Sequence, residues 1–111
     1  MGLSTCGRLF ALVARKSDIE FEAQSMEQHR MYLSGMMQGL LNTQSKLEPG
    51  TEAAKFIEAR VAQLQQADKM LEMHLNRIQS QRDSITKMVD ECRKIISENI
   101  QKSMGLLGQQ Q

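Results

Sequence analysis

The residues that could do acid–base or metal chemistry are few, and they do not gather into a recognisable site. His29 and His74 are the only histidines, and neither has another His or a Cys three or four residues away. A zinc site needs several such ligands in register. Asp18, Glu20 and Glu22 alternate along the chain, which on a helix scatters their carboxylates over different faces. We therefore expect no catalytic, metal-binding or cofactor-binding residues and no enzymatic activity.

The composition of the 111 residues favours long helices over a compact globular core, because there is no Trp and aromatic content is only 4%. The formal charge is +1, with five basic and four acidic residues in 1–47 and nine of each in 48–111. This balance argues against charge-driven binding to nucleic acid or to a membrane surface. The longest apolar run has six residues (9–14), whereas a membrane span needs about 20, so we expect no span.

Two heptad patterns dominate the chain. Apolar residues recur every seventh position from Leu12 to Leu47, and again from Ile57 to Cys92 with companions four residues further on. Steps of three and four place such residues on one stripe of a helix, which predicts coiled-coil packing. We expect the helix–helix seam to contain Leu12, Ile19, Met26, Leu33, Leu40, Ile57, Leu64, Leu71, Ile78, Ile85, Val89, Cys92 and Ile96.

One strong break separates the two patterns, at Pro49 and Gly50. Pro disfavours helix at the residue before it, and Gly permits a tight turn. Thr51 is positioned to cap the second helix, and Ser4 or Thr5 the first. The expected elements are a helix over about 4–46, a turn over 47–51, a helix over about 52–103 and a flexible tail over 104–111.

Because the connection is short, the two helices should lie antiparallel. The predicted fold class is all-α, a single domain (1–111) formed by a two-helix coiled-coil hairpin and completed by oligomerisation.

More apolar surface is present than one seam can bury, which predicts contacts with another subunit. The expected subunit-contact residues are Phe10, Phe21, Tyr32, Gly35, Met36, Gly39, Met73 and Met88. Gly35 and Gly39 lie four residues apart inside the first helix, either as tolerated soft spots or as a point where another helix approaches closely.

Two pairs of residues are nearly equidistant from the turn. Arg30 and Asp68 either form an ion pair that sets the register or extend separately to water. Cys6 and Cys92 should lie at about the same level, Cys92 as a small buried hydrophobe, and we expect two free thiols.

The opening MGLSTCGRLFALVARKSDIEFEAQSMEQHR resembles the start of small helical proteins from bacteria with flagellar or type III export systems. The body, two long helices broken at a Pro-containing turn, resembles their needle-type and axial subunits. This resemblance implies export without a cleaved signal and assembly into helical filaments. The turn here reads EPGT, whereas needle subunits usually carry a Pro-Ser/Asp-x-Pro turn, and this chain is longer than most of them.

Two functions are consistent with these patterns. The first is a non-enzymatic structural subunit whose partners are copies of itself and components of an export apparatus, which would place it in an extracellular or cell-surface filament. The second is a coiled-coil adaptor or export chaperone that binds an unlike protein, which would place it in the cytoplasm. Met-rich faces, here drawn from nine Met residues, suit adaptable binding of that kind.

Overall fold

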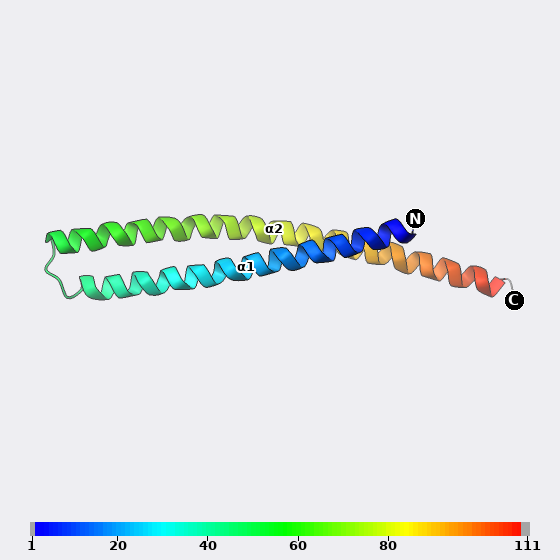
Figure 1. The fold of residues 1–111 in the computed structure, drawn as a ribbon, viewed down its shortest axis with the longest axis horizontal. Coiled ribbons are helices and arrows are strands. Elements are labelled where there is room, and N and C mark those ends of the chain that lie inside the picture. The colour runs from blue at the N-terminus through cyan, green and yellow to red at the C-terminus, as the bar shows by residue number, and fades with distance from the viewer. Residues whose placement is uncertain (1, 110–111) are drawn as a thin grey trace. The chain divides into compact units, whose positions relative to one another are not determined.

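The fold is described by a computed structural model that covers residues 2–109, with the side chains of residues 4–106. It contains two helices, α1 (Gly2–Gln44) and α2 (Glu52–Gln109), joined by residues 45–51. The chain is therefore an all-α antiparallel helical hairpin, as the heptads and the single break predict (Figure 1). Among the described residues, neither helix has a stretch long and apolar enough to cross a membrane.

The turn forms where the sequence places Pro and Gly. Its hydrogen bonds explain why α1 ends and α2 begins there. At the end of α1, the N–H groups of Lys46 and Leu47 donate to carbonyls three residues earlier, at 3.1 and 3.0 Å, which tightens the last turn. Gly50 has φ of +82°, a conformation that side-chain-bearing residues rarely adopt. Thr51 Oγ1 accepts the Ala54 N–H at 3.2 Å, so the predicted cap on α2 is present.

The observed helix boundaries differ from the expected ones at three places. Helix α1 begins at Gly2, so Ser4 and Thr5 lie inside it rather than capping it. It ends at Gln44, two residues before the expected boundary. Helix α2 continues to Gln109 through the expected tail, because Met, Leu and Gln favour helix and each Gly costs only about 1 kcal/mol. The last two residues of that tail, 110 and 111, lie outside the described residues.

The chain divides into two compact units, which we describe separately. The turn unit comprises residues 22–78, in which the last half of α1 runs antiparallel to the first half of α2. Its core is a single apolar stripe from each helix. The buried residues are Ala23, Met26, Leu33, Ala54, Ile57, Val61, Leu64, Leu75 and Ile78, with Leu40 and Leu71 half-buried.

The terminal unit comprises the described residues 2–21 and 79–109, in which the start of α1 lies beside the second half of α2. Its buried residues are Ile19, Ile85, Val89 and Cys92, while Leu12 and Ile96 are half-buried. Each residue expected in the seam is thus buried or half-buried within its own unit. Burying a side chain of this size contributes about 1.5–3 kcal/mol, so the stripe is the main source of stability in both units.

Candidate functional site

The most developed polar cluster joins α1 to α2 in the turn unit. Arg30 Nε donates to Asp68 Oδ1 at 2.9 Å, and Arg30 Nη2 donates to Asp68 Oδ2 at 3.3 Å. The same Nη2 lies 3.7 Å from Glu72 Oε2. Of the two arrangements that the sequence left open for Arg30 and Asp68, the structure shows the ion pair. A two-point contact of this kind holds one helix at a defined level against the other.

Each partner stabilises the charged form of the other. The hydrogen bond from Arg30 lowers the pKa of Asp68 below its ordinary value, and partial burial of the carboxyl opposes this. The hydrogen bond to Asp68 raises the pKa of Arg30, and the negative charges of Asp68, Glu72 and Glu27 add to the effect. Because the pKa of Asp68 is lower in the folded than in the unfolded chain, the pair stabilises the fold at neutral pH. That stabilisation begins to be lost as the pH falls through the ordinary pKa of an Asp carboxyl, about 4, and it is gone once the pH lies below the lowered pKa of the folded chain.

A double-mutant cycle on Arg30→Ala and Asp68→Ala should therefore show non-additive costs, each measured as a change in the free energy of unfolding. Both side chains are partly exposed, so the coupling should be small, and it should disappear in acid. Arg60→Ala combined with Asp68→Ala is the matched control and should be additive, because Arg60 bonds Gln63 instead. Equal coupling in both cycles would contradict a specific Arg30–Asp68 contact.

The histidines and cysteines are separate from this cluster. His74 Nε2 lies 3.4 Å from Glu22 Oε1 at an exposed position in the turn unit, and His29 is exposed. Cys6 is half-buried and Cys92 is buried, both as free thiols of the terminal unit. Within residues 2–109 no three His, Cys, Asp or Glu side chains gather in a way that could hold a metal ion.

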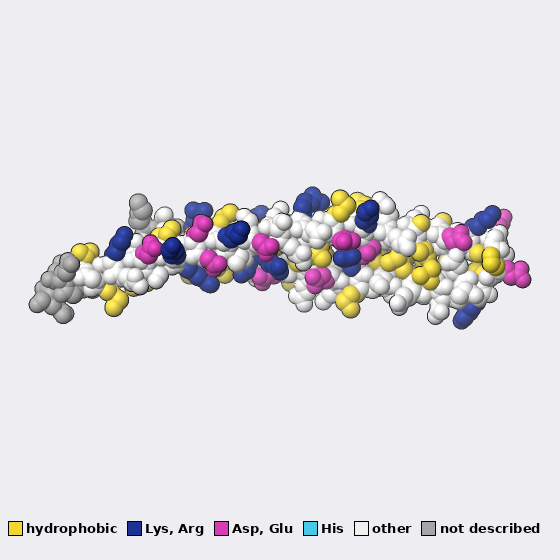
Figure 2. All heavy atoms as spheres, turned by 180° about the vertical axis from the view of Figure 1, so that it is seen from behind, with side chains coloured by type: hydrophobic (Ala, Val, Ile, Leu, Met, Phe, Trp, Pro, Cys, Tyr) yellow, Lys and Arg dark blue, Asp and Glu magenta, His cyan; other side chains and the backbone are white. Residues whose placement is uncertain are grey.

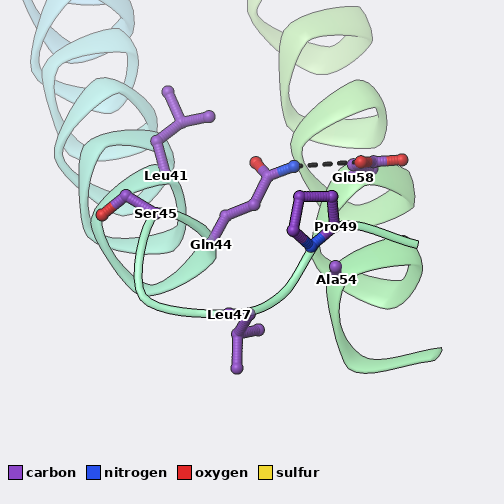
Figure 3. A pocket seen from close by; sticks show the side chains of 7 residues that line it. All are labelled: Leu41, Gln44, Ser45, Leu47, Pro49, Ala54 and Glu58. Carbon is purple, nitrogen blue, oxygen red and sulfur yellow. Dashed lines mark hydrogen bonds between the residues drawn. The ribbon is translucent and has the colours of Figure 1, made fainter. Parts of the chain in front are cut away.

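A shallow hollow of about 350 Å³ opens beside the turn (Figure 3). It is lined by Leu41, Gln44, Ser45, Leu47, Pro49, Ala54 and Glu58. Its polar groups are engaged with one another or with backbone: Gln44 Nε2 donates to Glu58 Oε1 at 3.1 Å, and Ser45 Oγ donates to the Asn42 carbonyl at 2.7 Å. The Gln44–Glu58 hydrogen bond connects the two helices next to the turn, so the polar groups of this hollow have a structural role.

Exposed apolar side chains are the most prominent feature of the outer faces, and Figure 2 shows some of them among charged groups on one face. Phe10, Phe21 and Tyr32 recur every eleven residues along α1, and all three are exposed. Eleven residues make slightly more than three helical turns, so such residues project from nearly the same side of a helix. We name Phe10, Phe21 and Tyr32 the aromatic stripe.

The other expected subunit-contact residues are also accessible to differing degrees. Met73, Gly35 and Gly39 are exposed, whereas Met36 and Met88 are half-buried. Apart from the backbone of its own helical turn, a Cβ atom added at Gly35 or Gly39 would meet nothing within 4 Å, so no other described part of the chain approaches these glycines closely.

Some exposed apolar residues were missing from the expected contacts, notably Met31, Phe56 and Ile100. They lie on outer helix positions, which the seven-residue repeats do not include. The eleven-residue spacing of the aromatic stripe is a signal in the sequence that is independent of those repeats.

When the chain is compared with protein-family models, with curated proteins and with solved structures, no match is found.

Proposed function

We propose that this protein is a non-enzymatic structural subunit that associates with copies of itself through helix–helix packing to build a filament or rod. The observation that carries the proposal is the distribution of apolar side chains. Each helix buries one stripe, yet Phe10, Phe21, Tyr32, Phe56, Met70 and Met73 remain largely in water. Apolar surface of this extent on a soluble helix is typical of an interaction surface.

The core of the hairpin is formed by only two helices, so association with another copy would bury additional apolar surface. No large side chain among the described residues is completely buried, because each faces only one neighbouring helix. Helical bundles usually bury such side chains by packing further helices around them. A second hairpin laid along the outer face of α1 would cover the aromatic stripe and deepen the core of both copies.

The filament and its export are supported by the resemblance of the N-terminal thirty residues and the hairpin architecture to subunits of flagellar and type III systems. An interface that pairs different surfaces of successive copies does not close, so it propagates as a helical array. The aromatic stripe suits such an interface because it runs lengthwise along α1, from Phe10 to Tyr32.

Self-association should depend on the aromatic stripe and not on aromatic surface in general. Phe21→Ser should weaken association about fivefold or more, because a large apolar contact in an interface contributes more than about 1 kcal/mol. Phe56→Ser is a closely matched control: Phe56 is 73% exposed and Phe21 is 74% exposed, but Phe56 lies on α2 outside the stripe. Sedimentation equilibrium at micromolar concentrations measures both variants, with circular dichroism to check that helix content is unchanged.

If the unaltered protein were a folded monomer at every concentration tested, the proposal would be contradicted. Equal weakening by Phe21→Ser and Phe56→Ser would place the interface elsewhere. Negative-stain electron microscopy then distinguishes a filament or rod from a closed ring or small oligomer.

The two exposed glycines provide a second prediction, in which folding and association move in opposite directions. Gly35→Ala with Gly39→Ala should stabilise the hairpin by about 0.5–1 kcal/mol per site, since Ala favours helix and nothing in the chain opposes a Cβ atom there. If another copy approaches these glycines, the same change should weaken association. Thermal unfolding and sedimentation measure the two effects. Tighter or unchanged association would show that these glycines are soft spots of α1 outside the interface.

An adaptor or export chaperone is the second candidate, and the exposed Met70 and Met73 on α2 favour it. In that case the purified chain is a monomer or small oligomer, and Met73→Glu disturbs binding of an unlike protein while leaving self-association unchanged. Under the first proposal, copies of the chain associate without any added protein.

A further inference from the structure

Folding gathers positive charge in the terminal unit that neither half of the sequence shows. Residues 2–17 and 92–109 belong to the same compact unit although they lie at opposite ends of the chain. Together they carry six basic residues, Arg8, Arg15, Lys16, Arg93, Lys94 and Lys102, against one acidic residue, Glu98. We name these two segments the basic end. Its net charge is +5 in a chain whose total is +1, so the remainder carries −4.

The charge is confined to this end and is accessible. Acidic residues resume immediately beyond it, at Asp18 on α1 and at Asp90 and Glu91 on α2. Of the basic side chains, only Lys16 is half-buried, while the other five residues are exposed. Lys16 also pairs weakly with Glu20, at 4.0 Å.

The same two segments also carry exposed apolar side chains. Phe10, Val13, Ile95, Ile100, Met104 and Leu106 all belong to the basic end and are exposed. Figure 2 shows hydrophobic, basic and acidic side chains interspersed on the face that it draws. A groove of about 410 Å³ between the helices has Leu9, Ile96 and Ile100 in its apolar lining, and Arg93 beside them.

We propose that the basic end is a docking surface for an anionic lipid bilayer, with its apolar side chains placed at the headgroup level. Clusters of four to eight Lys and Arg beside apolar side chains are the composition that binds anionic membrane surfaces. The observations favour a bilayer over nucleic acid, because only one aromatic residue, Phe10, is available there to stack on bases. They disfavour a second copy docked end to end, since two ends of charge +5 repel each other.

This inference does not rest on the proposed self-association, because lipid binding by the basic end needs no contact with another copy; Phe10 is the one residue that the aromatic stripe and the basic end share. Assembly through the aromatic stripe would increase membrane binding by presenting several basic ends together.

The test is flotation of the full chain with vesicles of phosphatidylcholine alone or mixed with phosphatidylserine. Binding should require the anionic lipid and should fall with rising salt. Each Lys or Arg near an anionic surface strengthens binding about fivefold, so Arg93→Gln, Lys94→Gln and Lys102→Gln together should weaken it at least about tenfold. The matched control replaces Lys55, Arg60 and Lys69 of the turn unit by Gln and should change binding less than about twofold.

A second variant tests the apolar part of the surface. Ile100→Ser with Met104→Ser should weaken vesicle binding, whereas Met70→Ser with Met73→Ser in the turn unit should not. Helix content by circular dichroism should be unchanged in all variants, since these residues are exposed.

The proposal would be overturned by no binding to anionic vesicles at low salt, by equal loss in the two triple variants, or by tighter retention of single-stranded RNA than of anionic vesicles. A change of oligomer size in the basic-end triple variant without vesicles would assign this surface to contacts between copies and would also overturn it. Loss of self-association with vesicle binding intact would instead contradict only the proposed function.

Discussion

Replacing Leu64 by Ala should lower the free energy of unfolding by about 2–5 kcal/mol, the range for removing a well-packed Leu side chain from a core. Leu64 is 5% exposed and lies in the single apolar stripe of the turn unit. The cost includes the lost burial of apolar surface and the cavity left behind. A loss of this size is a large share of the total stability of a small domain, about 5–15 kcal/mol. Urea unfolding followed by circular dichroism, at one fixed protein concentration, measures the change.

The control is Phe56→Ala on the same helix, which removes a larger side chain from a position that is 73% exposed. It should alter the free energy of unfolding by no more than about 0.5 kcal/mol, because exposed side chains make few packing contacts. If the Leu64 variant cost as little as the Phe56 variant, the stripe would not be the core of the hairpin.

Val89→Asp should have an even larger effect in the terminal unit. Val89 is 3% exposed, so the introduced carboxylate would lose its hydration with no partner designed to receive it. An unpaired buried charge costs about 3–5 kcal/mol, which should open the packing between residues 2–21 and 79–109. Hydrogen exchange should show faster exchange of the amides in these two segments before those in the turn unit.

Acid should relieve part of this damage. Burial raises the pKa of an unpaired carboxyl, so the folded variant takes up a proton more readily than the unfolded one, and the variant gains relative stability as the pH falls. Ser84→Asp, at an exposed position on the same helix, is the control and should stay within about 0.5 kcal/mol of the unaltered protein. Comparable loss in the two variants would mean that a charge is tolerated at neither face of α2, which contradicts the observed seam.

Much of the local structure followed from the sequence because helices and their caps depend on neighbouring residues. Six heptads without Pro or Gly specify a long helix, and the connection around Pro49 and Gly50 cannot readily continue one. The cap at Thr51 was predictable for the same reason, since its hydroxyl bonds an N–H only three residues away. The helix ends were less predictable, because the gain from one more turn at Gln44 or Gln109 is small.

The candidate interaction surfaces were only partly predictable. Phe10, Phe21 and Tyr32 were identified because they fall outside the seven-residue repeat, but Phe56 and Met31 were not, although they are equally exposed. Residue type alone does not tell which outer positions a neighbouring helix shields. That depends on how the two helices are rotated against each other, which is a property of the packed pair.

The sequence by itself therefore determined the two helices, the turn between them and the stripe that each helix buries, because these follow from local periodicity. Only the tertiary structure decided whether Arg30 pairs with Asp68 or extends to water, since both choices are compatible with the sequence and differ only in side-chain geometry across the helices. The tertiary structure also decided how charge is distributed over the molecule. Each half of the chain is nearly neutral, but folding places residues 2–17 and 92–109 in one unit and sums their positive charges. Electrostatic fields add in space and not along the chain, which is why the fold was needed to reveal this end.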